Sequence, residues 1–359
     1  MTNLDFSALR SAPRLLVEAS LKPVQGERFQ PTGFADLGAA RYTLTDGTDM
    51  LLVESAQSVA NRLEAAVWDD AKADLIDALH GLPYVRVAVN TKNGSLGTTT
   101  TLQESHRLNS AYLWSLTADK NLETFQQSLS AAVGVKIRKS KKDKAKEAEG
   151  EGGDEPTGIL DMRKIARGLF KFDPNTVLHG AFLEKIDGRL RLARALSGFI
   201  EARKARVAES GGVKNDRVDP SGDSGQGFAN VPFHRTEFVA DSITAYFSLD
   251  LALLRGYGLG NDATDLLTAL ALLKMRRFLE NGLRLRTACD FDVIGDLRVT
   301  RPAGLILPTT EALLAAMPSY ITACKELFAT PAITEVSGTY EKKSKKDKTA
   351  EGDEGEGEE

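Results

Sequence analysis

The sequence predicts an α+β fold of the split β-α-β-β-α-β (ferredoxin-like) kind. Residues 15–22 and 84–89 alternate apolar and polar side chains as strands with one buried face do, and a third such run lies within 238–254. Residues 55–68 and 262–281 instead repeat their apolar side chains with the period of a helix. The resulting order is strand, helix, strand, a long interruption, strands, helix and strand. This order favours the split fold over a doubly wound sheet.

The first strand leads into a loop that is rich in hydrogen-bond donors. The apolar residues from Leu15 to Leu21 share one face of the strand, and the chain leaves the sheet at Lys22-Pro23. Donors suited to an anion or a sugar–phosphate chain follow, with Phe29 able to stack between them: Lys22, Gln25, Arg28 and Gln30. A surface loop with ordinary solvated side chains is the alternative interpretation.

The rest of the first half is predicted to form short strands and helices. Residues 41–43 and 50–53 flank Thr45-Asp46-Gly47-Thr48, a strong hairpin signal. Ser55 is placed to cap a helix through Trp68, in which Val59 and Leu63 belong to the apolar stripe. We further expect a short helix at 71–79, a strand at 84–89, a loop at 94–101 and helices at 108–116 and 122–133.

The second half contains a long loop between predicted strands. Residues 210–227 are Gly, Ser, Asp and Asn-rich, and a loop of this length is usually functional or mobile. A strand at 188–196 would place Arg189 and Arg191 on one face. The other expected elements are a strand at 177–183, the strand run within 238–254, a turn at 256–260, a helix at 262–281 that Gly282 stops, strands at 297–300 and 304–307, and a helix at 309–317.

Composition indicates a soluble globular protein. The chain has 359 residues, of which 42% are hydrophobic and 27% charged. We found no apolar run long enough to span a bilayer and no secretory h-region, so we expect a cytoplasmic protein with no membrane association. The two cysteines, Cys289 and Cys324, lie far apart in the sequence, which argues against a disulfide framework or a Cys-ligated zinc site.

Two charged segments interrupt this picture. Residues 138–155 contain no apolar side chain larger than Ala, and the string KSKKDK found there returns near the C-terminus. Such segments cannot offset their ordering entropy. We therefore expect one domain formed by residues 1–137 and 157–340, with a disordered charged insert at 138–156 and a disordered charged tail at 341–359.

The net charge of −4 is unevenly distributed. Residues 185–206 hold seven basic and two acidic side chains, and residues 274–286 hold five basic and one acidic. The local field, more than the global charge, steers a polyanion. The composition therefore permits nucleic-acid binding without demanding it, and each basic cluster taken alone is more often a solvated face.

None of the candidate enzyme motifs in the sequence has all the residues that the motif requires. The run from Gly256 to Gly260 lacks both the dinucleotide spacing and the Lys-Ser/Thr of a P-loop. Asp290, Asp292 and Asp296 suggest a magnesium site, but an EF-hand loop would need Glu where Arg301 stands. The four histidines share no ligand spacing. The sequence therefore predicts no catalytic residue, no metal site and no cofactor.

Several stretches, in this order, resemble one known family: VEASLKPVQGERFQPTGFADLG, ESAQSVANRLE, SGGVKNDRV, VPFHRTEF and GLRLRTACDF. The family is the RAMP-superfamily backbone subunit of type I-G (formerly I-U) CRISPR effector complexes, and the match runs over most of residues 14–310. The resemblance implies an RRM-like palm with a large helical insertion and a thumb-like hairpin. It also implies that several copies line up along one CRISPR RNA (crRNA), beside other Cascade subunits, in an oligomer that pairs with target DNA in antiviral defence.

A subunit that accepts any spacer needs contacts to phosphate and 2′-OH groups, because base pairing supplies the sequence specificity. We therefore expect these side chains to bind RNA: Lys22, Gln25, Arg28 and Gln30 in the first loop, Gln57, Asn61 and Arg62 on the first helix, Lys214, Asn215 and Arg217 on the glycine-rich loop, His234 and Arg235 after it, and Arg284 and Arg286 in the last basic cluster. Two alternatives stay open. One is a nuclease that uses Asp290, Asp292 or His234, and the other is a protein scaffold that uses the charged segments.

Overall fold

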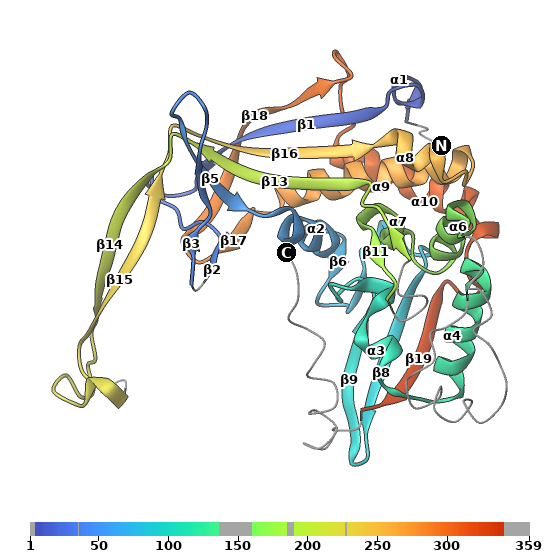
Figure 1. Cartoon of the computed structure of the whole chain (residues 1–359), viewed down its shortest axis with the longest axis horizontal. Helices are drawn as coiled ribbons and strands as arrows, with labels where there is room; N and C mark the ends of the chain where they lie inside the picture. Colours follow the sequence, from blue (N-terminus) through green and yellow to red (C-terminus); the bar gives the residue numbers. More distant parts are fainter. Residues whose placement is uncertain (1–3, 35, 136–159, 185–189, 227, 341–359) are drawn as a thin grey trace. The chain divides into compact units, whose positions relative to one another are not determined.

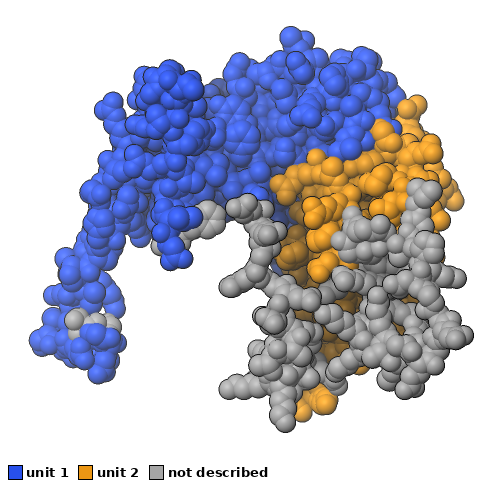
Figure 2. Space-filling view, in the orientation of Figure 1, with its two compact units in different colours: residues 1–78, 195–255, 264–319 blue, residues 79–194, 256–263, 320–359 orange. Residues whose placement is uncertain are grey.

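The computed structural model describes residues 4–34, 36–135, 160–184, 190–226 and 228–340. They divide into two compact units (Figure 2). Unit 1 comprises Met1–Ala78, Ala195–Arg255 and Thr264–Ser319, and unit 2 comprises Leu79–Arg194, Gly256–Ala263 and Tyr320–Glu359. The expectation of one domain with insertions stays a prediction. The charged insert and tail, at 138–156 and 341–359, lie outside the described residues.

Unit 1 is built on a seven-stranded antiparallel sheet with the strand order β17-β18-β1-β16-β13-β5-β4 (Figure 1). The α+β class with an antiparallel sheet is therefore confirmed. The strands are β1 (Arg14–Pro23), β4 (Arg41–Thr43), β5 (Asp49–Glu54), β13 (Leu196–Arg203), β16 (Ser242–Asp250), β17 (Arg284–Arg286) and β18 (Cys289–Arg301).

The core of unit 1 lies between the buried face of this sheet and two helices, α2 (Ala56–Ala65) and α9 (Asn261–Glu280). In β1 the residues from Leu15 to Leu21 alternate between buried and more exposed positions, as predicted. Helix α2 packs on β13, and Phe278 of α9 meets Phe247 of β16 edge to face, with ring centroids 6.1 Å apart. Side-chain alternation thus sets which face of the sheet the helices cover.

Helix α2 begins where the sequence predicts. The Ser55 hydroxyl accepts a hydrogen bond from the Ser58 amide at 3.3 Å, which satisfies one of the unpaired N–H groups at the helix start. Val59, Ala60 and Leu63 are buried. The smaller elements of unit 1 are α1 (Ser7–Arg10), β2 (Gly33–Phe34), β3 (Gly38–Ala39), β6 (Trp68–Asp69), β7 (Asp74–Leu75), the 3₁₀ turns at Asp77–Leu79 and Ser224–Gln226, α8 (Leu251–Gly256), and α10 (Thr310–Ala323), whose end belongs to unit 2.

A long β-hairpin forms its own two-stranded sheet in unit 1. It pairs β14 (Arg206–Lys214) with β15 (Val231–Val239) in continuous register, from Arg206 opposite Val239 to Lys214 opposite Val231. The predicted loop at 210–227 was wrong over its first five residues, which are strand. A Cβ at Gly211 would lie 2.4 Å from the Phe233 carbonyl oxygen, so glycine here reflects the close approach of the two strands and not a turn.

Unit 2 carries a four-stranded sheet in the order β10-β19-β8-β9, with β19 and β8 parallel. Helix α4 packs against α6, where Phe125 and Phe172 meet edge to face at 5.4 Å. Its elements are β8 (Tyr84–Thr91), β9 (Gly94–Thr100), a 3₁₀ turn (Arg107–Asn109), α3 (Ala111–Trp114), β10 (Thr117–Ala118), α4 (Lys120–Val133), α6 (Met162–Phe172), α7 (Pro174–His179), β11 (Ala181–Phe182), β12 (Arg191–Leu192), a 3₁₀ turn (Lys325–Leu327) and β19 (Ile333–Thr339).

Several predicted elements were wrong. Of the strand predicted at 177–183, only Ala181–Phe182 is strand (β11), and 177–179 belong to α7, a helix that Asp173 caps and Pro174 begins. The loop predicted at 94–101 is strand β9, and the helix predicted at 71–79 is a short strand and a 3₁₀ turn. The helix predicted at 108–116 is reduced to a 3₁₀ turn and α3, and 304–307 form no strand. Of the strand predicted at 188–196, only Arg191–Leu192 and the start of β13 are strand, and 188–189 lie outside the described residues.

Candidate functional site

The predicted RNA-binding residues fall at three places in unit 1. The first is where the loop after β1, helix α2 and strand β17 meet. The second is the base of the β14–β15 hairpin, and the third is its distal end.

A buried carboxylate organises the first place. Glu54, the last residue of β5, is completely buried. Its Oε1 accepts a hydrogen bond from Arg62 Nε at 2.9 Å and one from the Ser58 hydroxyl, and its Oε2 forms an ion pair with Arg286. We call Glu54, Ser58, Arg62 and Arg286 the Glu54 cluster. Two guanidinium groups on one carboxylate give the cluster one excess positive charge.

The two arginines also donate to main-chain carbonyls. Arg62 reaches the carbonyl of Arg284 in β17 at 3.3 Å. Arg286 reaches the carbonyls of Gln30, in the loop after β1, and Val53, in β5, at 3.1 and 3.2 Å. Partial burial lowers the pKa of the Arg62 guanidinium from its ordinary value. The cluster therefore ties together three of the segments in which the sequence predicts RNA contacts: the loop after β1, α2 and β17.

Cys289 is part of the same environment. Its sulfur lies 3.2 Å from Arg286 Nη1, which favours the thiolate, yet burial outweighs this and raises the pKa of the thiol to about 11. Thiol reactions need the thiolate. The geometry thus describes an inert, structural cysteine.

We expect the Cys289 thiol to resist alkylation at neutral pH. In a Cys324→Ser variant, where Cys289 is the remaining thiol, maleimide labelling of the folded protein at pH 7.5 should be slower than that of a free thiol by a factor on the order of 100. The denatured variant is the control and should label at the free-thiol rate. A folded rate equal to the denatured rate would contradict the buried assignment.

The second place is the base of the hairpin. Arg28, from the loop after β1, and Arg235, from β15, both lie near the Glu237 carboxylate, at 3.5 and 3.6 Å. Phe29 and Phe238 exchange two backbone hydrogen bonds of 2.9 Å, which fastens the loop to β15. This arrangement joins the loop to the hairpin through main-chain contacts and leaves the Arg28 side chain 57% exposed.

The third place, the distal hairpin, presents exposed polar and apolar side chains together. Lys214, Asn215 and Arg217 are exposed, as are the apolar Val218 and Phe228. His234, back along β15, pairs through Nε2 with Glu209 of β14. These residues are remote in the fold from the Glu54 cluster, because the hairpin lies outside the seven-stranded sheet (Figure 1).

The structure thus brings some predicted residues together and separates others. Arg62, Arg286 and the backbones of Gln30 and Arg284 meet at the Glu54 cluster. The side chains of Lys22, Gln25, Gln57, Asn61 and Arg284 are exposed around it on the same segments. The predicted contacts of all of these residues with RNA stay predictions. Sequence reasoning missed Glu54, Ser58 and Glu237, and the available signal was an acidic residue directly after the apolar run of β5.

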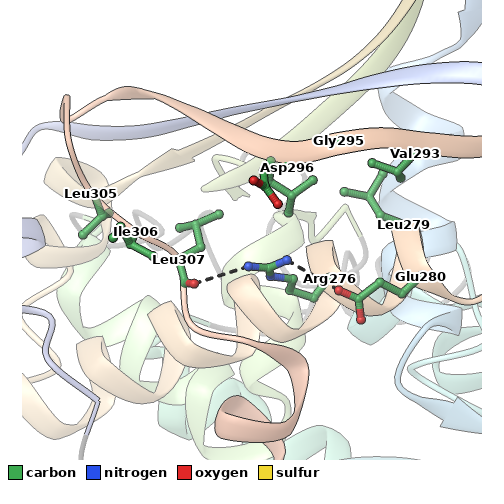
Figure 3. A pocket seen from close by; sticks show the side chains of 10 residues that line it. Arg276, Leu279, Glu280, Val293, Gly295, Asp296, Leu305, Ile306 and Leu307 are labelled. Carbon is green, nitrogen blue, oxygen red and sulfur yellow. Dashed lines mark hydrogen bonds and ion pairs between the residues drawn. The ribbon is translucent and has the colours of Figure 1, made fainter.

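A cavity of about 650 Å³ lies elsewhere in unit 1, between α9, β18 and residues 305–307 (Figure 3). Its walls are mostly apolar, and Arg276 lies within it. The Arg276 guanidinium donates to the carbonyls of Pro308 and Leu307 at 3.1 and 3.3 Å and lies 3.6 Å from Glu280, so the protein already occupies its donors. We assign no ligand to this cavity.

The residues of the nuclease alternative do not form a metal site. Asp290 lies 3.6 Å from Arg284, Asp292 is exposed on β18 opposite Lys22 of β1, and His234 is on the hairpin. In the part of the chain that the structure describes, no group of three or more His, Cys, Asp or Glu side chains is placed to hold a metal ion. The same described part contains no helix that is both long and apolar enough to span a membrane.

Comparison with known proteins assigns the chain to a protein family. A family model described as CRISPR-associated protein GSU0053 matches residues 15–207, more than half of the sequence. The chain belongs to this family. The resemblance to a CRISPR-associated protein seen in the sequence is thereby confirmed. The matched range of the GSU0053 family contains β1, the loop after it, the Glu54 carboxylate and α2.

Solved structures are similar to this GSU0053-family chain only at low scores. A chain of a structure titled "CRISPR RNA-guided surveillance complex, pre-nicking" is 15% identical, with 88% of this chain and 89% of that chain covered and a TM-score of 0.41. The crystal structure of Thermofilum pendens Csc2 is 11% identical, with coverage of 90% and 79% and a TM-score of 0.31. These scores carry no argument about function. A comparison with curated proteins gave no match.

Proposed function

We propose that this chain is the crRNA-binding backbone subunit of a type I-G CRISPR effector complex, or Cascade. Membership of a CRISPR-associated family supports the proposal that the chain works in a CRISPR complex. The observation that carries the RNA-binding role is the meeting of three donor-bearing segments, the loop after β1, α2 and β17, at the Glu54 cluster. Exposed Lys, Arg, Gln and Asn side chains on these segments suit phosphate and sugar oxygens.

The strand order supports an RRM-like palm as part of this proposal. The central strands run β18-β1-β16-β13, and α2 and α9 lie where the two crossover helices of a split β-α-β-β-α-β fold would lie. The β14–β15 hairpin is then the thumb-like element, and unit 2 the helical insertion. Within this framework the predicted contacts are distributed over the palm and the thumb.

The subunit would hold the guide by its backbone and leave the base edges free. Pairing of the guide with target DNA supplies sequence specificity, so a subunit that accepts any spacer gains nothing from reading bases. Further copies of the chain and other Cascade subunits would be its protein partners in the cytoplasm. The proposed role requires no catalysis by this subunit and no cofactor.

An Arg28→Gln variant tests the proposed function. Arg28 is a largely exposed arginine in the loop after β1, so its loss should remove one phosphate contact. For single-stranded RNA this lowers the slope of log K against log salt concentration by about 0.7. Binding should weaken by the same factor for two RNAs of unrelated sequence, measured by fluorescence anisotropy from 50 to 300 mM salt.

A matched control uses another exposed basic residue of unit 1. Lys72 is held between Asp69 and Asp77, and Lys72→Gln should leave the slope unchanged. Absence of RNA binding by the unaltered chain, or an effect of Arg28→Gln on one RNA sequence only, would contradict the proposal.

A further inference from the structure

We propose that Glu54 is a positioning residue: through Arg62 and Arg286 it holds the loop after β1 and strand β17 in their RNA-binding arrangement, and those two arginines do not themselves bind phosphate. The inference rests on the proposed function. It concerns how the site is organised, and it assigns to the two arginines a role different from the one that their sequence positions suggest.

The hydrogen bonds of Arg62 carry the first step. Its Nε donates to Glu54, its Nη1 to the Arg284 carbonyl and its Nη2 to the Leu285 carbonyl. All three guanidinium nitrogens thus have acceptors within the protein. A guanidinium has five N–H groups, and a bidentate phosphate contact needs two on one edge. Three of the five N–H groups of Arg62, one on each nitrogen, are thus committed to the fold.

Exposure separates the two kinds of arginine. The side chains of Arg62 and Arg286 are 30% and 25% exposed, whereas those of Arg28 and Arg284 are 57% and 74% exposed. The exposed pair has an ion-pair partner only at 3.5 and 3.6 Å, which leaves the guanidinium available to solvent. The buried pair is therefore suited to support, and the exposed pair to contact with a ligand.

The loop is fixed at the end that the cluster holds. The Gln30 carbonyl accepts from Arg286 at 3.1 Å, and its amide donates to the Ala288 carbonyl at 2.8 Å. Two residues on, the Thr32 amide donates to the Val53 carbonyl at 2.9 Å. Gln25 and Arg28 are thus presented by a loop whose backbone is already ordered. Because the loop is already ordered, RNA binding does not have to offset the entropy cost of ordering it. This raises the affinity without adding a contact.

The two roles predict different responses to a lysine substitution. Lysine keeps the positive charge and binds phosphate as a point charge, but its single nitrogen does not reproduce the planar fork whose three nitrogens reach the Glu54 carboxylate and two carbonyls. If Arg62 positions β17, and through Arg286 of β17 also the loop after β1, Arg62→Lys and Arg62→Gln should both weaken RNA binding, by about tenfold, with the salt slope unchanged. If Arg62 contacts phosphate, Arg62→Gln should lower the slope by about 0.7 and Arg62→Lys should restore it.

The experiment measures both variants against a matched pair at Arg28, with the full chain and one single-stranded RNA. Arg28→Gln should lower the slope and Arg28→Lys should restore it, which shows that the assay detects a single phosphate contact. Equal losses for both Arg62 variants at an unchanged slope support the inference. A lower slope in Arg62→Gln that Arg62→Lys restores would overturn it and leave the proposed function intact.

A measurement without RNA keeps the inference testable if the chain proves not to bind RNA. Hydrogen exchange of the amides in residues 24–32 should be faster in the Arg62 variants, because β17 loses the contacts of Arg62 with its carbonyls and Arg286 of β17 then holds the Gln30 carbonyl less firmly. Where those variants do not fold, Ser58→Ala removes only the hydroxyl that donates to Glu54 and should give the same faster exchange. Unchanged exchange in a folded variant would overturn the inference, whatever the outcome for RNA.

Discussion

A Glu54→Ala variant is expected to lose about 3 kcal/mol of the free energy of unfolding of unit 1. The carboxylate is completely buried and compensates two guanidinium groups. Its removal leaves Arg62 and Arg286 facing each other without a counter-charge, in a site that water reaches only partly. Their exposed fractions of 30% and 25% allow some solvation, which sets the loss at the lower end of the range for broken buried ion pairs.

The measurement can be confined to unit 1. The chain has two tryptophans, Trp68 in unit 1 and Trp114 in unit 2. In a Trp114→Phe background, the fluorescence change in urea therefore reports Trp68 and the unfolding of unit 1. Two-state behaviour should be checked against circular dichroism, because a chain with two compact units can unfold in more than one step.

The matched control is Glu18→Ala. Glu18 lies on β1 of the same sheet and pairs with Arg298, whose side chain is 70% exposed. Exposed ion pairs contribute about 0.2–1 kcal/mol, so this loss should be clearly smaller. Equal losses for the two variants would mean that the burial of Glu54 does not set its contribution. That result would contradict the role assigned to the cluster.

The sequence predicts the elements of this fold that have strong periodicity. The alternation in β1 and β16 and the Ser55 cap of α2 all reappear in the structure. Elements whose secondary structure depends on pairing with distant parts of the chain were predicted wrongly. Strand β9 is Gly and Thr-rich and is a strand because it pairs with β8. Local propensity predicts a loop there, and the tertiary pairing overrides it.

The candidate site shows the same division. Sequence reasoning can identify donors, and it named Arg62, Arg286 and Gln30. It cannot say which donors face the interior of the same protein. That depends on α2 and β17 approaching each other from positions more than 200 residues apart, as the contact of Arg62 with the Arg284 carbonyl shows. A buried carboxylate such as Glu54 cannot be identified from the sequence for the same reason, since its partner Arg286 is distant in the chain.

Shortening the β14–β15 hairpin should abolish the joining of several copies on one RNA while leaving unit 1 folded. Ser210 and Arg235 are directly opposite each other in the hairpin register, so an Asn-Gly turn in place of residues 211–234 can close the ladder at that pair. Among the removed residues that the structure describes, none belongs to the seven-stranded sheet, and every side chain with a described burial except that of Ala229 is exposed or half-buried. We therefore expect the free energy of unfolding of unit 1, measured in urea, to stay within about 0.5 kcal/mol of its original value.

The loss of function should have two separable parts. Removal of Lys214 and Arg217 should take away the two phosphate contacts proposed for them and lower the salt slope by about 1.4. Removal of the exposed Val218 and Phe228 takes away apolar surface that a neighbouring copy would cover. Sedimentation of the shortened chain with an RNA long enough for several copies should then show single copies bound. A Lys214→Gln, Arg217→Gln double variant separates the parts, because it should lower the slope equally and still assemble. Assembly of the shortened chain at its original stoichiometry would show that the hairpin does not join neighbouring copies.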